Sequence, residues 1–383
     1  MTQSSIFDAE TRRLPQHFTQ NDIVAALHNN STWTKGDAYV MDLLKDRVKK
    51  GMLVQTGNTY SVNPNYVSPT TPAAPAPTRR AATPARAITP IVPWTKVYNL
   101  YEYAHEYLVS KTMVWKGVSR AVANAEVLSY ENVCNVDYDI SAGLSDIQAL
   151  YKELATTLQT GGRMPNVIQF LNPARLPVFS RILHGFDPSA VITHYGSWRA
   201  LLTALVSAFG VLPTETWENY AQGLYTGADL LRPFANKTAF DTFIKSFPKN
   251  PSNPKGYDYP EYAGKVKNGA PYRVFGMAYV LACNYLKECG HKSYIKPDTH
   301  VLAVCAAIGL CPTGSASACQ RACQIRAAKA GVTPYALDKV LWLCCSGQFY
   351  RTSLAKFGGG ASKLKPAFIK ELQAAIKAGY LVP

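Results

Sequence analysis

The sequence predicts a mainly α-helical protein with a small α+β domain ahead of a larger helical one. Apolar residues recur at helical spacing through most of the chain beyond residue 96. Within the first 65 residues the apolar period changes from that of helices to that of short strands. A proline-rich segment without acidic residues separates the two parts and has the composition of an extended tether. We therefore expect a domain at 1–65, a linker at 66–95 and a helical domain at 96–383.

The 383-residue chain is strongly basic, with 40 Lys plus Arg against 25 Asp plus Glu and a formal net charge of +15. Such an excess steers a protein toward polyanions, and we favour nucleic acid over an anionic membrane. With 47% hydrophobic residues and 17% charged residues, the composition excludes a mostly disordered chain. We find neither an apolar run long enough to span a bilayer nor an export signal, so we expect a cytoplasmic protein without a membrane partner.

The N-terminal domain is predicted to contain two helices followed by a β-hairpin. Thr19 can cap the first helix, and the second begins near Thr34 and ends at Gly51. Two short alternating runs follow, joined through Gly57-Asn58, a pair typical of hairpin turns.

This order, with the phrase "LLKDRVKKGMLVQTGNTYSVNP", resembles a winged-helix domain. The resemblance implies that the helix at about Lys35–Lys49 faces DNA, with Lys35, Lys45 and Lys49 as candidates for phosphate contact. Residues 1–65 carry a net charge of only +1, whereas residues 97–383 carry +10. A winged helix that binds protein therefore remains an alternative, and the large domain is the stronger candidate for polyanion binding.

The large domain is expected to be almost entirely helical. Ser145 is the predicted cap of a helix that begins this pattern, and residues 133–140 look extended. Further helices are predicted near residues 198–208, 239–247, 279–288, 300–309, 318–330, 335–344 and 366–378.

The segment "YRVFGMAYVLACNYLKECGHKSYIKPDTHVLAVCAAIGL", residues 272–310, is the most informative part of the chain. Gly276 and Ala278 predict a tight turn before an apolar helix, and small residues there let backbone N–H groups approach an anion. A loop then leads through Pro297 to Asp298 at the start of the next helix.

This arrangement resembles the helix-hairpin-helix superfamily of DNA glycosylases, whose signature is a hairpin L-P-G-V-G-x-x-T-A followed by a loop and V-D-T-H. Gly276, Met277 and Ala278 fall on the hairpin, which the resemblance assigns to the DNA backbone. The superfamily's catalytic acid falls on Asp298, within "KPDTHV". The hairpin departs from the signature at Phe275 and at Ala278, which replaces the second glycine.

In bifunctional members a Schiff-base lysine occupies the hairpin position that falls on Val280. Valine has no amine, so the resemblance implies a monofunctional enzyme that flips out a base and hydrolyses its glycosidic bond, leaving an abasic site. Asp298 would stabilise the oxocarbenium ion and orient water. Two alternatives remain open: Lys287, Lys292 or Lys296 could replace the missing amine, and Asp298 could be a plain helix cap.

Several further lysines are candidates for DNA contact. Lys363 and Lys365 lie in a basic tail next to three consecutive glycines, and Lys296 precedes the predicted catalytic acid. A solvated helix face accounts for the tail almost as well.

We expect no cofactor and no metal. The nine cysteines are irregularly spaced, as in a reducing compartment where most are small buried residues. The cysteines from residue 311 onward lack the compact spacing of an iron–sulfur cluster, and helical core packing accounts for a second group better than zinc binding does. The first set is Cys311, Cys319, Cys323, Cys344 and Cys345, and the second is Cys283, Cys289, His291 and His300.

The substrate is the least determined part of the interpretation. The phrase "LACNYLKECG…YIKPDTHV" resembles a divergent branch of glycosylases associated with hypermodified phage bases. The resemblance implies a monomeric anti-phage enzyme acting on double-stranded DNA with a bulky modified pyrimidine such as glucosylated 5-hydroxymethylcytosine. A non-catalytic winged-helix regulator and a housekeeping repair glycosylase for alkylated or deaminated bases are the alternatives.

Overall fold

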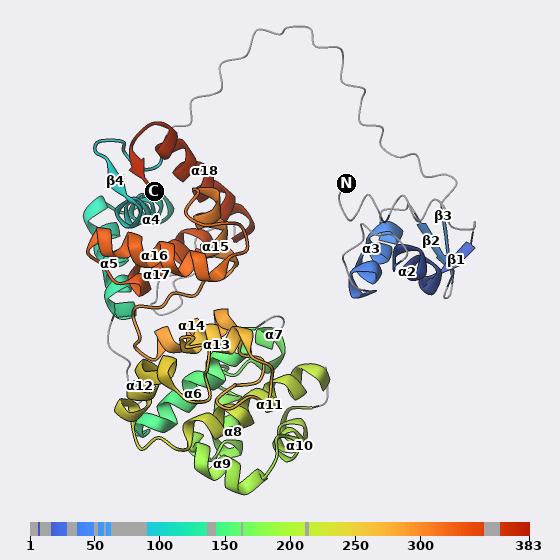
Figure 1. Cartoon of the computed structure of the whole chain (residues 1–383). Coiled ribbons are helices and arrows are strands. Elements are labelled where there is room, and N and C mark those ends of the chain that lie inside the picture. Colours follow the sequence, from blue (N-terminus) through green and yellow to red (C-terminus); the bar gives the residue numbers. More distant parts are fainter. Residues whose placement is uncertain are drawn as a thin grey trace. The chain divides into compact units, whose positions relative to one another are not determined.

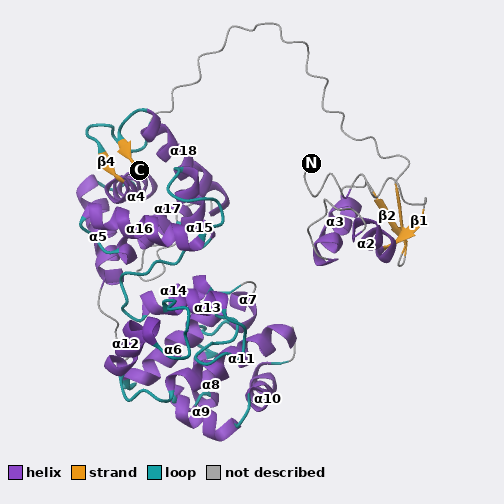
Figure 2. Ribbon diagram, viewed as in Figure 1, coloured by secondary structure: helices purple, strands orange, loops and turns teal. Residues whose placement is uncertain are grey.

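The structure is a computed structural model in which helices dominate (Figure 2), so the expectation of a mainly α protein is confirmed. The chain separates into two compact units, residues 1–88 and 89–383, which are described in turn. The described residues are 7, 17–28, 37–49, 53–56, 59–62, 90–135, 143–161, 164–210, 214–347 and 361–383.

The small unit combines two helices with a three-stranded sheet (Figure 1). Strand β3 pairs antiparallel with both β1 and β2, so the strand order is β1-β3-β2. Strand β1 was not expected, whereas the two helices and the β2–β3 pair follow the predicted order. The turn at 57–58 and the predicted helix start near Thr34 lie outside the described residues. The elements are β1 (His17–Thr19), α2 (Gln20–His28), α3 (Asp37–Lys49), β2 (Leu53–Thr56) and β3 (Thr59–Val62).

The first helix of this unit begins where the sequence predicts. The Thr19 N–H donates to Asp22 Oδ2 at 2.6 Å, and the Asp22 N–H donates to Thr19 Oγ1 at 3.4 Å. This reciprocal pair satisfies backbone donors that a helix start leaves without partners. Helices and strands then bury a shared core that includes Phe18, Ile23 and Leu44.

The helices of the large unit form two groups (Figure 1), and each group encloses a hydrophobic core. Helices α4, α5 and α15–α18 surround the first core, and α6–α14 form the second. The elements are β4 (Tyr98–Asn99), α4 (Leu100–Lys116), α5 (Arg120–Asn135), α6 (Asp146–Gln159), α7 (Met164–Ile168), α8 (Leu176–Ile182), η1 (His184–Phe186), α9 (Pro188–Tyr195), α10 (Trp198–Phe209), α11 (Thr214–Leu231), α12 (Lys237–Ser246), η2 (Phe247–Lys249), α13 (Tyr259–Lys265), α14 (Tyr279–Glu288), α15 (Thr299–Ala307), α16 (Ala316–Ala330), α17 (Pro334–Ser346), α18 (Ala361–Lys377) and β5 (Leu381–Val382).

The path of the chain between the two cores determines where the predicted catalytic segment lies. The chain begins in the first core and then forms the second. It crosses back after Cys289, which packs in the second core, and reaches the first core again at Ile295. Asp298 follows three residues later. A short parallel pairing of β4 with β5 joins the two ends of the unit.

Local signals in the large unit are confirmed at Ser145. Its Oγ accepts from the Gln148 N–H at 3.4 Å, and Gln148 Oε1 accepts from the Ser145 N–H at 2.8 Å, which completes a capping box at the start of α6.

Two stretches differ from the sequence-based expectation. Residues 90–95, placed at the end of the linker, pack on the first core: Val92 is fully buried and the Ile91 N–H donates to Glu371 Oε1 at 2.6 Å. Residues 133–135, expected to be extended, form the end of α5. Valine favours strands, but so short a stretch is a weak signal, and continuation of helix α5 overrides it.

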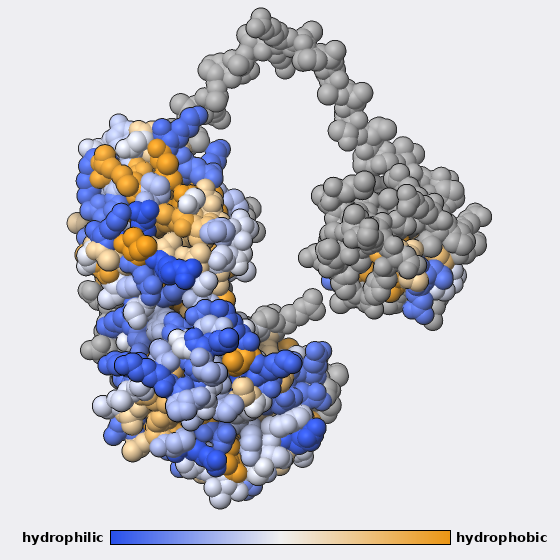
Figure 3. Space-filling model, viewed as in Figure 1, coloured by the Kyte–Doolittle hydropathy of each residue, from blue (hydrophilic) through white to orange (hydrophobic). Residues whose placement is uncertain are grey.

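The large unit has a mixed surface. On the face shown in Figure 3, hydrophilic residues are spread over both halves of this unit and hydrophobic ones lie among them. Among the residues with assigned positions, no helix combines the length and apolar character needed to cross a bilayer.

Candidate functional site

The predicted hairpin joins two helices that pack closely together. A Cβ atom on Gly264 of α13 would lie 3.1 Å from Tyr279 Cβ at the start of α14, so a glycine permits this approach. The turn before α14 contains Gly276 at φ +73°, and the Met277 N–H donates to Val274 O at 3.2 Å. Met277 is buried, whereas Gly276 and Ala278 are exposed. The segment therefore folds as helix, tight turn, helix with two small residues on its surface.

Hydrogen bonds from Arg273 stabilise this turn. Its guanidinium donates to the carbonyl oxygens of Val274 and Met277, at either side of Gly276. Thr226 of α11 adds a third contact, because its Oγ1 accepts from the Phe275 N–H at 2.9 Å. Burial lowers the pKa of Arg273, and the nearby Tyr259 and Tyr262 partly oppose this decrease.

The sequence analysis missed Arg273 and Thr226. Thr226 lies 49 residues from its partner, and no local pattern indicates that an arginine will fold back on the carbonyls of the next turn. The signal that was present is the positive φ suggested by Gly276, which marks a turn but does not identify what stabilises it.

The N-terminus of α14 carries no side-chain cap. Ala278 occupies the N-cap position in extended conformation, and an alanine side chain cannot accept from the first-turn N–H groups. These donors lie next to the exposed turn at Gly276. A helix start of this kind can accept an anion such as a phosphate.

Asp298 caps the next helix with one of its two oxygens. Its Oδ1 accepts from the N–H groups of His300 at 2.8 Å and Val301 at 3.2 Å. The side chain is partly exposed, and within the described part of the chain no group bonds Oδ2. Asp298 therefore is a helix cap, but the cap hydrogen bonds use only one of its two carboxylate oxygens.

Two titratable side chains flank this carboxylate. Lys296 Nζ lies 3.4 Å from Thr160 Oγ1, and burial followed by the nearby Lys287 charge lowers the pKa of Lys296, while Asp298 opposes this. Burial also lowers the pKa of His300, whose ring meets Trp342 edge-on with centroids 6.3 Å apart. The start of α15 therefore gathers a carboxylate, a half-buried amine and an imidazole.

A buried ionic network lies next to this group and joins the two cores. Lys287 of α14 contacts Asp338 of α17, and Lys339 Nζ of α17 lies 2.7 Å from Glu288 Oε1 of α14. Tyr335 donates its hydroxyl to Glu288 Oε2 at 3.2 Å. Burial raises the pKa of Asp338, which Lys287 and Lys339 oppose. Sequence reasoning did not find the network because its partners are about 50 residues apart.

The remaining predicted lysines are dispersed. Lys45 and Lys49 are exposed on α3 of the small unit, and Lys35 lies outside the described residues. On α18, Lys365 is half-buried and its charge helps to lower the pKa of His300. Lys363 belongs to the same helix, but its side chain lies outside the described part of the structure.

Among the described residues, the two cysteines and two histidines considered as an alternative zinc site do not lie together as one group of ligands. Cys283 and Cys289 are buried thiols whose pKa values burial raises. His291 Nε2 instead lies 3.1 Å from Asp241 Oδ1. Cys289 packs in the second core, and His300 at the start of α15 lies against Trp342 of the first.

Comparisons with protein-family models, with curated proteins and with solved structures found no match for this chain.

Proposed function

We propose that the chain is a monofunctional DNA glycosylase of the helix-hairpin-helix type. The observation that carries the proposal is Asp298, which caps α15 through Oδ1 and keeps Oδ2 available in a partly exposed position. A carboxylate held by two backbone N–H groups at a helix start has a fixed orientation. Its second oxygen is then placed to stabilise positive charge on a sugar.

The hairpin has the features of a DNA-backbone clamp. Gly276 and Ala278 expose the turn, Met277 anchors it in the core, and the uncapped start of α14 offers N–H donors to a phosphate oxygen. Arg273, which is itself partly exposed, supports this shape of the turn because its guanidinium donates to two carbonyl oxygens.

The reaction would be hydrolysis at the anomeric carbon of a flipped nucleotide. The glycosidic C–N bond breaks with its electron pair moving to the base, and Asp298 stabilises the oxocarbenium ion that results. A water oriented by Oδ2 then adds its oxygen to the sugar carbon, and the proton it loses passes through the carboxylate or solvent to the departed base. The products are a free base and an abasic site.

A covalent imine is the competing route, and its amine would have to come from Lys287, Lys292 or Lys296. Val280 has none, and Lys287 is tied into the buried pair with Asp338. Lys296 lies two residues from Asp298, and burial lowers its pKa, which favours the nucleophilic neutral amine. Strand cleavage before alkali treatment would replace the monofunctional proposal, with Lys296 as the first candidate nucleophile.

The small unit supports a DNA-binding accessory role. Its order β1-α2-α3-β2-β3 is compatible with a winged helix, and α3 presents Lys45 and Lys49 to solvent. We propose that double-stranded DNA with a bulky modified pyrimidine, such as glucosylated 5-hydroxymethylcytosine, is the substrate of a monomeric cytoplasmic anti-phage enzyme. A sequence-selective regulator and a repair glycosylase for alkylated or deaminated bases are the alternatives.

One experiment separates these functions. The full chain is incubated with normal and hypermodified phage DNAs and with duplexes carrying alkylated or deaminated bases, and released bases are identified by mass spectrometry. Release of a modified phage base supports the proposal, and release of only alkylated or deaminated bases supports the repair enzyme. Sequence-selective binding without any released base supports the regulator.

A further inference from the structure

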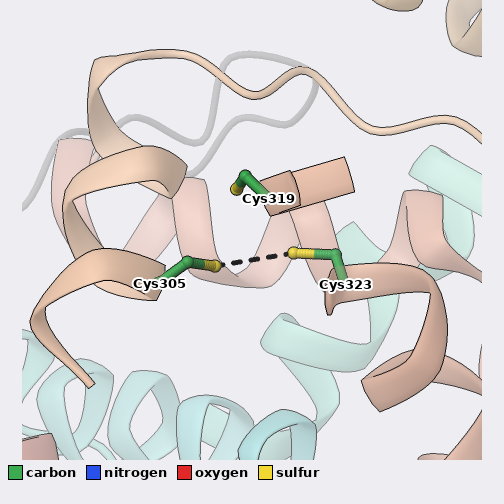
Figure 4. Close-up of side chains that lie close together, drawn as sticks. All are labelled: Cys305, Cys319 and Cys323. Carbon is green, nitrogen blue, oxygen red and sulfur yellow. Dashed lines mark hydrogen bonds between the residues drawn. The ribbon is translucent and has the colours of Figure 1, made fainter. Parts of the chain in front are cut away.

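Three cysteine thiols meet in the first core of the large unit, where the sequence suggested only scattered packing residues. Cys305 lies on α15, and Cys319 and Cys323 lie on α16; all three side chains are fully buried. Their Sγ atoms lie within 4.8 Å of one another, and those of Cys305 and Cys323 are 3.6 Å apart (Figure 4). Within the described residues this is the one such group of potential metal ligands.

The separation of the sulfur atoms suits a single tetrahedral metal ion. A Zn–S bond of about 2.3 Å places two sulfur ligands of a tetrahedron about 3.8 Å apart. Cys319 and Cys323 are four residues apart, so they share one face of α16 and form a natural chelating pair. Cys305 completes three corners from the neighbouring helix.

Neither a disulfide nor an iron–sulfur cluster fits this geometry as well as a single ion does. A disulfide would join only two of the three thiols and leave the third without a role. An iron–sulfur cluster distributes its cysteine ligands over two or four iron atoms, which spreads the sulfur atoms around the cluster rather than around one point.

We propose that Cys305, Cys319 and Cys323 bind a structural zinc ion, with Cys311 as the fourth ligand. Cys311 is a buried cysteine in the segment that leads from α15 to α16, and its sulfur lies outside the close group of three, so it would have to move toward the ion to complete the site. Thiolates are soft ligands that select zinc among the common cellular divalent ions, and a closed set of four is typical of structural zinc sites. Because the ligands come from two helices and the segment between them, spacing alone did not reveal the site.

The site would connect α15 to α16. Since α15 begins at Asp298, the ion would fix the helix on which the proposed catalytic carboxylate is mounted. The zinc proposal does not depend on the glycosylase proposal, because it is argued only from the cysteine geometry. It departs from the expectation of no metal.

The first test is the metal content of the purified full-length protein. Cells are grown with zinc, and zinc, iron and copper are measured per chain by inductively coupled plasma mass spectrometry. We expect one zinc ion per wild-type chain and loss of most of it in Cys305→Ser, Cys319→Ser and Cys323→Ser. The matched control is Cys289→Ser, a fully buried cysteine of the second core, which should keep its zinc.

A second measurement on the wild-type protein covers the case in which the serine variants do not fold. Cobalt(II) replaces zinc, and tetrahedral thiolate ligation should give intense sulfur-to-metal charge-transfer absorption and visible d–d bands. Cys311→Ser should weaken the charge-transfer band, and an unchanged band would exclude Cys311 as a ligand. Three results on the wild-type protein would overturn the proposal. The protein could lack zinc and also give no thiolate–cobalt spectrum, it could contain iron or copper in place of zinc, or its mass could show a disulfide.

Discussion

The ammonium group of Lys287 on α14 contacts the carboxylate of Asp338 on α17, and both side chains are almost completely buried. This ion pair lies where the second core of the large unit meets the first. A buried pair of this kind contributes little when intact, because desolvation offsets the attraction, but removal of one partner leaves an uncompensated charge.

We therefore expect Asp338→Asn to lower the free energy of unfolding by about 3–5 kcal/mol. The double variant Lys287→Met/Asp338→Leu should recover most of that loss, since it removes both charges. Urea unfolding of the large unit measures both. The exposed pair Lys265–Glu261, at 2.6 Å, is the control, and Glu261→Gln should change stability little. Equal stability of Asp338→Asn and wild type would show that the pair is not buried as described.

Gly276 tests the conformation of the hairpin. At φ +73° with open space where a Cβ would lie, Gly276→Ala introduces backbone strain of about 1 kcal/mol without a steric clash. The same substitution at Gly331, φ +68° and equally open, carries a similar cost at the end of α16. We expect both variants to lose similar stability, and only Gly276→Ala to bind duplex DNA more weakly by fluorescence anisotropy. Equal DNA affinities would remove the hairpin from the interface.

His291 predicts a pH dependence of stability. Burial lowers its pKa below the ordinary value of 6.5, with Asp241 opposing. The unfolded chain therefore binds this proton more readily than the folded one, so the stability is present above about pH 6.5 and is lost as pH falls through the depressed value. Thermal unfolding between about pH 5 and 7 should show a smaller decline for His291→Gln than for wild type. Exposed His194→Gln is the control, and identical profiles for all three proteins would contradict the assignment.

Lys45 and Lys49 test whether the small unit binds DNA. The slope of log K, the DNA association constant, against log salt concentration is negative. If each lysine contacts a phosphate, its replacement by Gln in the full chain should make this slope less steep by about 0.9. Exposed Lys329, on α16 of the other unit, provides the matched control. Unchanged slopes for Lys45→Gln and Lys49→Gln would favour a winged helix that binds protein.

How far the sequence predicts this molecule depends on the range of each interaction. Caps at Thr19 and Ser145 were found because their partners lie three residues away. The start of α15 at Asp298 was found for the same reason. The expectation of an extended segment at 133–140 was wrong at residues 133–135, where helix α5 continues, because a short stretch of β-favouring residues is a weak signal.

The surroundings of the site were beyond local pattern analysis. Lys287 and Asp338 are 51 residues apart, and Cys305 is 18 residues from Cys323 on a different helix. Such contacts are determined by how helices pack, which the spacing of residues in one helix does not encode. The pair Cys319 and Cys323 was the one available local signal, since four-residue spacing places both on one helix face.

The most direct measurement compares Asp298→Asn with Asp298→Ala for base release and for stability. Asparagine caps helices about as well as aspartate, whereas alanine should cost about 0.5–2 kcal/mol. We predict that Asp298→Asn keeps wild-type stability and DNA binding but loses roughly 100-fold or more of its base-release rate, because only the charge is removed. Wild-type base release by Asp298→Asn would show that Asp298 is only a helix cap and would contradict the proposed function.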